Sequence, residues 1–207
     1  MAARRRRLAA AGLLVVIALA TVYMWQYNIG PFASWNKIAG LQNEHMRAMP
    51  LERPSHLDLI FFRHGGVEFN AYGAGASVYI TQYKWGEQVL HQRLSGIGFG
   101  NEWEFSGQVI WGVTLDGTEP HQLRVQYWGH GFSSSYFDFT QLGFERYNMP
   151  STFNPWAETP RTAIERGRRY PLYVWQAGES VVWPRDVFDP DFLPEIENMV
   201  ILYLVFD

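Results

Sequence analysis

The first 25 residues constrain the fold of this chain more than any other feature. Four consecutive arginines, Arg4 to Arg7, run directly into an apolar stretch from Leu8 to Trp25. As a helix with about 1.5 Å of rise per residue, this stretch would reach roughly 27 Å, close to the hydrocarbon thickness of a bilayer. A basic flank stays on the cytoplasmic side while the longer C-terminal part is translocated. The sequence therefore predicts a cytoplasmic flank over residues 1–7 and a single-pass signal-anchor over residues 8–25.

A signal peptide cleaved after Ala20 is the competing interpretation, because Ala18 and Ala20 are small enough for signal peptidase. The apolar run, however, continues through this site without the polar region that normally precedes cleavage. Tyr23 and Trp25 also fall where aromatic residues line a membrane interface. We therefore favour an uncleaved anchor in the membrane, with a periplasmic or extracellular C-terminal domain.

The remainder of the chain is acidic and contains no cysteine. Without Arg4 to Arg7, 13 of the 17 basic residues remain against 20 acidic ones, so the exported part carries a charge of about −7. This sign disfavours nucleic acid or anionic lipid as a partner of the domain. The lack of cysteine excludes a lipoprotein anchored through an acylated cysteine and any disulfide.

The pattern after the anchor predicts one β-rich domain over residues 56–207, preceded by a juxtamembrane stalk or short helix over residues 26–55. Aromatic residues are frequent, with 14 Phe, 11 Tyr and 9 Trp, and they favour strands over helices. A second short helix is expected between Thr159, a capping residue, and Gly167. Strands are expected at residues 56–63, 77–85, 88–94, 108–115, 123–127, 133–140, 170–177, 181–183 and 199–206.

Three of these segments have clear patterns. Residues 108–115 and 123–127 alternate apolar and polar side chains around an Asp116-Gly117 turn, which predicts a hairpin. The uninterrupted apolar run from Met199 to Phe206 is too short to span a membrane and predicts a central buried strand. Many short strands, glycine turns and few helices indicate an antiparallel β-sandwich, jelly-roll-like in its organisation.

The best candidate binding residues lie around a histidine flanked by glycines. Tyr127 and Trp128 precede Gly129, and His130 lies between Gly129 and Gly131. Glycines allow unusual backbone angles, which would leave the imidazole accessible and the rings free to stack on a ligand. Trp103 is a further exposed-ring candidate. The alternative interpretation is a strand end whose rings cap the core.

Trp103 is also flanked by Glu102 and Glu104, which would point the same way if this segment is extended. Two carboxylates beside an aromatic ring suit a sugar hydrolase, although carboxylate pairs are common on solvent faces. No histidine spacing indicates a metal, and the glycines of residues 95–100 lack the lysine and helix of a phosphate loop. We therefore assign no catalytic residue, metal or cofactor.

Three functions remain open. The first is a membrane-anchored protein that works by binding an envelope or membrane protein, as an accessory, assembly or inhibitory factor. The second is glycan binding or envelope-sugar hydrolysis through exposed Trp and Tyr and paired carboxylates. The third is a structural subunit that uses the apolar helix as its interface, although few small residues line that helix.

Overall fold

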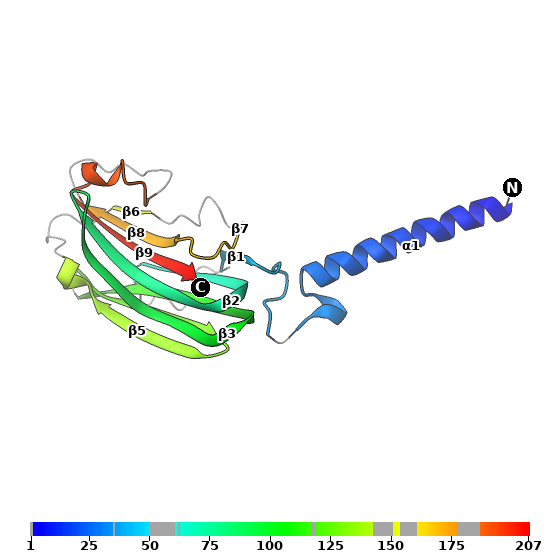
Figure 1. Cartoon of the computed structure of the whole chain (residues 1–207), viewed down its shortest axis with the longest axis horizontal. Helices are drawn as coiled ribbons and strands as arrows, with labels where there is room; N and C mark the ends of the chain where they lie inside the picture. The colour runs from blue at the N-terminus through cyan, green and yellow to red at the C-terminus, as the bar shows by residue number, and fades with distance from the viewer. Residues whose placement is uncertain are drawn as a thin grey trace.

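A computed structural model of the chain shows a long N-terminal helix that projects from a β domain (Figure 1). It describes residues 2–34, 36–49, 61, 63–116, 119–142, 151–153, 161–177 and 187–207. The helix α1 spans Ala2–Gln26, and a 3-10 turn, η1, follows at Gly30–Phe32. The 23 residues Ala10–Phe32 include an apolar window with a mean hydropathy of 1.6, none of which is buried against the domain. By length and composition this segment can cross a membrane, as the sequence predicts.

Antiparallel strands make up most of the domain. They are β1 (His45–Ala48), β2 (Arg63–Lys84), β3 (Glu87–Asp116), β4 (Glu119–Gly129), β5 (Phe132–Asp138), β6 (Ser151–Phe153), β7 (Arg161–Ala163), β8 (Tyr170–Ala177) and β9 (Asn198–Phe206). Short 3-10 turns, η3 (Phe139–Leu142) and η5 (Leu193–Glu195), follow β5 and precede β9. The predicted mostly-β antiparallel fold behind one N-terminal helix is confirmed.

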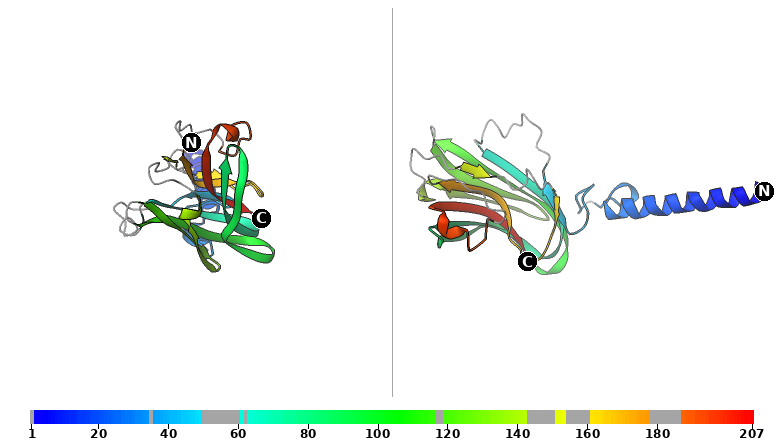
Figure 2. Two further views of the ribbon diagram at one scale, coloured as in Figure 1. Left: turned by 90° about the vertical axis from the view of Figure 1, so that its left-hand side faces the viewer. Right: turned by 90° about the horizontal axis from the view of Figure 1, so that it is seen from above.

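Strands β2 and β3 form one long ribbon, and its bend folds a single continuous nine-stranded sheet into two facing layers, which we call the two sheets (Figures 1 and 2). Their register slips at the bend, where Gly73 faces Trp103 but Gly75 faces Gly98, so residues 99–102 of β3 bulge outward. Before the bend the ribbon continues through β4 to β5 on one side and through β1 to β7 on the other. After the bend, β2 pairs with β9, which leads to β8 and β6. Strands that bulge and switch sheets make the corners of a sandwich.

Glycine allows the two strands to approach each other at this bend. A Cβ atom on Gly75 would lie 2.4 Å from the backbone oxygen of Ile97, and one on Gly73 would lie 2.3 Å from the backbone oxygen of Asp207. Neither distance leaves room for a side chain. The bend therefore depends on the absence of a Cβ atom rather than on a left-handed backbone conformation.

The core lies between the two sheets. Val109, Trp111 and Val113 of β3 face Tyr127, Val125 and Leu123 of β4 in register, and all six side chains are buried. This confirms the predicted hairpin. The side chains of β9 are buried on both faces, because residues such as Leu202 join the main core while Ile201 packs under the segment that carries Val187 and Ile196. The predicted central strand is thus confirmed between β2 and β8.

The hairpin at the far end of the β2–β3 ribbon also follows the prediction closely. The turn residues are Trp85 and Gly86, one position earlier than expected, with φ angles of 52° and 82°. Two successive residues with positive φ are typical of a tight type I′ hairpin turn, whose twist matches that of the strands. Strands 133–140 and 170–177 are likewise found as β5 and β8.

Both predicted short helices are wrong where the structure describes them. In the region predicted as a stalk or short helix, residues 26–55, the described residues after Gln26 form the turn η1 and the strand β1. In the second predicted helix, residues 161–163 before Gly167 form β7. These two strands pair with each other, Met46 opposite Thr162. Burial of Met46 in the core and sheet pairing outweigh weak local helix signals.

One predicted strand end is also wrong. The strand expected at residues 56–63 does not end at Arg63, because β2 begins there and continues through Gly65 and Gly66. A Cβ atom on Gly65 would lie 2.4 Å from the ring of Trp111. These glycines make room for a large side chain on the neighbouring strand. Residues 56–60 and 62 of the strand predicted at residues 56–63, and the whole strand predicted at residues 181–183, lie outside the described residues.

Candidate functional site

The end of the sandwich nearest α1 is fastened to the linker that follows the helix. Asn70 of β2, 2% exposed, accepts a hydrogen bond from the Ile38 backbone N–H at 2.7 Å and donates to the carbonyl oxygens of Ile38 at 3.1 Å and Leu41 at 2.9 Å. Asn28, just past the helix, donates to the same Leu41 oxygen at 2.8 Å. We call Asn28, Leu41 and Asn70 the linker clasp. It joins the helix end to the sheet through a single carbonyl.

Other contacts reinforce the clasp. The Gly40 backbone N–H donates to the Tyr27 carbonyl at 2.8 Å, which folds the linker back onto the helix end. Arg47 of β1 donates to the Gly40 carbonyl at 3.2 Å and forms a largely buried ion pair with Glu68 at 2.5 Å. Lys37 pairs with Glu104 of β3 at 2.9 Å. The predicted stalk is therefore an ordered connection built from polar groups.

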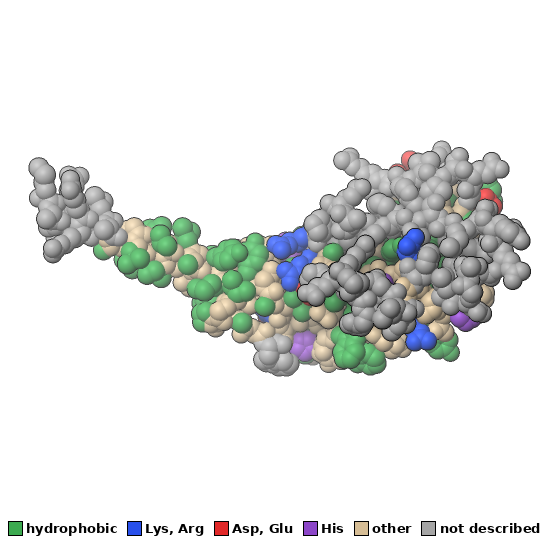
Figure 3. Space-filling view, turned by 180° about the vertical axis from the view of Figure 1, so that it is seen from behind, with side chains coloured by type: hydrophobic (Ala, Val, Ile, Leu, Met, Phe, Trp, Pro, Cys, Tyr) green, Lys and Arg blue, Asp and Glu red, His purple; other side chains and the backbone are tan. Residues whose placement is uncertain are grey.

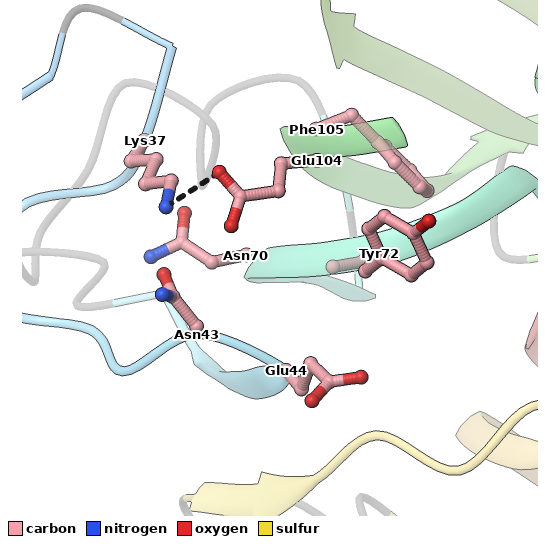
Figure 4. A pocket seen from close by; sticks show the side chains of 8 residues that line it. Lys37, Asn43, Glu44, Asn70, Tyr72, Glu104 and Phe105 are labelled. Atoms are coloured by element: carbon pink, nitrogen blue, oxygen red, sulfur yellow. Dashed lines mark ion pairs between the residues drawn. The ribbon is translucent and has the colours of Figure 1, made fainter. Parts of the chain in front are cut away.

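A pocket of about 230 Å³ opens beside the clasp (Figure 4). Its lining combines carboxylates, amides, a cation and aromatic rings: Lys37, Asn43, Glu44, Asn70, Ala71, Tyr72, Glu104 and Phe105. Figure 4 shows Asn43 and Asn70 between Glu44 on one side and the Lys37–Glu104 ion pair on the other. Amide and carboxylate groups beside a Tyr ring can hydrogen-bond the hydroxyls of a small polar ligand while the ring packs on its apolar face.

Glu102 and Glu104, the predicted carboxylate pair, are engaged by different cations. Arg166 donates to both carboxylate oxygens of Glu102, at 2.5 and 3.3 Å, while Glu104 pairs with Lys37. The guanidinium of Arg166 also lies 5.2 Å from the centre of the Tyr72 ring. Hydrogen bonding to Glu102 raises the pKa of Arg166 above its usual value. Each predicted carboxylate thus belongs to an ion pair of its own.

Trp103 and His130, two of the four predicted binding residues, lie together. Their ring centres are 4.7 Å apart, and Phe99 packs edge-on against Trp103 at 4.8 Å. Phe99 in turn contacts Phe105 at 5.1 Å, and Phe105 is fully within the core. Trp103 is nevertheless 41% exposed. This arrangement supports the interpretation in which the rings cap the end of the core, with one face of the cap open to solvent.

Tyr127 lies apart from this cluster, inside the core. It is 1% exposed, and its hydroxyl would lie 2.7 Å from a Cβ atom on Gly129 and 2.8 Å from one on Gly107. Gly129 therefore provides space for the phenol ring, and it does not adopt the unusual backbone angle proposed from the sequence. Burial raises the pKa of the Tyr127 hydroxyl well above its usual value.

Trp128 points to the opposite face of the sheet, because successive residues of β4 alternate sides. There it contacts Phe132 of β5 at 4.8 Å between ring centres. Trp128, Phe132 and Tyr136 are 51%, 58% and 72% exposed, and we call these three residues the aromatic patch. The patch lies beside β5, the last strand on its side of the sheet, which pairs with β4.

Sequence reasoning missed most of the residues that now define these sites. Phe132 and Tyr136 carried a usable signal, since they alternate with Ser134 on one face of a strand whose opposite face holds buried Phe137. Asn70 and Lys37 carried none, because their partners are distant in the sequence. Among the residues that the structure describes, no three His, Asp or Glu side chains lie close enough together to hold a metal ion.

Comparison with known proteins adds no information on the function of this chain. No protein-family model, no curated protein and no solved structure matches this chain. Three features therefore carry the functional argument: the exposed apolar helix with its linker clasp, the polar pocket beside that clasp, and the aromatic patch at the sheet edge.

Proposed function

We propose that this protein is a single-pass membrane protein whose β-sandwich lies outside the cytoplasm and binds an envelope or membrane protein. Arg4 to Arg7 support an orientation with the N-terminus in the cytoplasm. The apolar segment Ala10–Phe32, whose helical residues 10–23 are exposed, supports anchoring by α1. A mature protein that begins at Thr21 would contradict the anchor, and protease protection of the β domain in sealed cells distinguishes the two orientations.

The observation that carries the binding proposal is the aromatic patch. Large aromatic side chains that are exposed together are enriched at protein interfaces and unusual elsewhere on a surface. β5 also lacks the lysine, proline or bulge that commonly protects an edge strand, and Asp138 at its end is its one charged residue. A partner can therefore pack on Trp128, Phe132 and Tyr136 and extend the sheet along β5.

Site-specific photocrosslinking in intact membranes tests this proposal. A photoreactive amino acid at Tyr136 is expected to give one discrete adduct, and Phe132→Ser is expected to reduce its yield several-fold. Trp85, which is 66% exposed at the β2–β3 hairpin tip, provides the matched control for an exposed aromatic residue outside the patch. No adduct at Tyr136, or the same adduct from Trp85, would refute the patch as the binding surface.

Glycan binding is the second candidate, and the pocket favours it. Glu44 from the linker and Glu104 from β3 reach one pocket from separate parts of the fold, together with the Tyr72 ring. Glycan sites commonly combine such hydrogen-bonding groups with an aromatic face, and hydrolases use two carboxylates in this way. Titration with soluble envelope oligosaccharides tests this candidate. Binding that survives Tyr72→Ala and Glu104→Gln unchanged would exclude the pocket.

A further inference from the structure

We propose that the bent end of the β2–β3 ribbon binds the headgroup layer of the bilayer that α1 crosses, through the exposed rings of Trp103 and Tyr72. This inference rests on the proposed anchoring by α1 and adds a second, peripheral membrane contact to it. The domain then lies on the membrane surface in a fixed orientation, with the distal β2–β3 hairpin tip pointing away from the lipid.

The linker clasp sets the height of the domain above the membrane. Asn28 lies within the membrane-spanning segment Ala10–Phe32, and it shares the Leu41 carbonyl with Asn70 of β2. The sheet is therefore joined to the end of the apolar segment through one oxygen, the Leu41 carbonyl, which accepts both hydrogen bonds. The bend at Gly73 lies three residues from Asn70 in β2, which is about 10 Å of extended strand. Each headgroup layer is roughly 5–8 Å thick, so the bend and the linker clasp are separated by a distance comparable with one headgroup layer.

The bent end faces α1 in the fold. Figure 1 shows the turn of the β2–β3 ribbon on the side of the domain nearest the helix, and the hairpin tip on the opposite side. Basic side chains gather at the junction between the apolar helix and the domain (Figure 3). The end of the domain that faces the apolar helix is therefore the end that would meet the headgroup layer.

The chemistry of this end suits a lipid interface. Trp103 and Tyr72 are each 41% exposed, and both residue types prefer the headgroup level because they combine an apolar ring with a polar group. The carboxylates of Glu102 and Glu104, on either side of Trp103, are held in ion pairs, so they do not present free negative charge to lipid phosphates. Binding should therefore need no anionic lipid and should respond little to salt.

Because the chain contains no cysteine, each introduced cysteine is a unique labelling site. Single cysteines placed at Gly100, at Lys84 and at Leu19 of the full-length protein carry a nitroxide label in phosphatidylcholine nanodiscs. Gly100 lies in the β3 bulge with no atom within 4 Å of an added Cβ, Lys84 is exposed beside the distal hairpin tip, and Leu19 is in α1. Electron paramagnetic resonance then measures relaxation of each label by nickel-chelating lipid headgroups and by oxygen.

The label at Gly100 is expected to relax several-fold faster with nickel-chelating headgroups than the label at Lys84, equally at low and high salt. Trp103→Gln should abolish this difference while leaving the oxygen accessibility of the label at Leu19 unchanged. Equal relaxation at Gly100 and Lys84, or a difference that requires anionic lipid, overturns the proposal. If the label at Leu19 shows no oxygen-rich environment, the anchoring itself fails, which separates the two ideas.

Discussion

Replacing Asn70 by alanine should destabilise the domain far more than its small size suggests. The change removes three hydrogen bonds and leaves the backbone N–H of Ile38 without its acceptor in a partly buried setting. Each hydrogen bond contributes on the order of 1 kcal/mol net, so the expected loss is about 3 kcal/mol. Domains of this kind have total stabilities of roughly 5–15 kcal/mol, so this loss is a large fraction. Asn70→Asp keeps the acceptor but turns a carboxylate oxygen toward two carbonyls, and it should be at least as damaging.

Urea unfolding of the full-length protein in detergent, followed by tryptophan fluorescence, measures this loss. With a denaturant slope of about 2 kcal/mol per M, the midpoint should fall by roughly 1.5 M. Asn101→Ala is the matched control, because Asn101 is exposed in the β3 bulge. A shift below about 0.5 M for Asn70→Ala, or an equal shift for Asn101→Ala, would show that the clasp does not stabilise the fold.

Four further outcomes follow from the fold. Gly75→Ala should lower the melting temperature by several degrees because its Cβ meets backbone at 2.4 Å, whereas Gly98→Ala, its register partner with open space, should not. The Tyr127 hydroxyl is buried with no hydrogen-bond partner among the described residues, so Tyr127→Phe should be neutral or stabilising at pH 7 in thermal melts. Burial raises the folded-state pKa of Tyr127, so wild type should lose stability as pH rises above about 10, where the unfolded tyrosine ionises, and Tyr127→Phe should lose less. Deletion of residues 199–207 should give an insoluble product, and a soluble fragment with a cooperative melt would contradict the central position of β9.

Local sequence patterns predicted the strands in which buried side chains follow a regular pattern along the chain. The alternation in β4 and the uninterrupted apolar run of β9 each identify how many faces of a strand are buried, and burial is what decides the structure there. The tight turn at Trp85 and Gly86 was similarly visible, because glycine supplies one of its two positive φ angles at low cost.

The sequence predictions are wrong where contacts between residues far apart in the sequence determine the structure. Residues 34–49 and 159–167 carry helix-like spacing and caps, but β1 forms because it pairs with β2 and β7, and β7 forms because it pairs with β1. The candidate sites also depend on contacts between residues that are distant in the sequence. Trp103 and His130 were predicted and do meet, yet the pocket and the clasp depend on Asn70 and Lys37, whose partners lie about 30 or more positions away in the chain.

The β2–β3 ribbon that passes from one sheet to the other has a consequence for how the molecule opens. Neither sheet can detach without breaking hydrogen bonds in strands that also belong to the other sheet. Amide protons near Phe69 on one side of the bend and near Ile80 on the other should therefore exchange with solvent through the same global opening. A force applied along α1 would likewise be transmitted through the clasp to both sheets at once, so the domain should resist pulling as one mechanical unit.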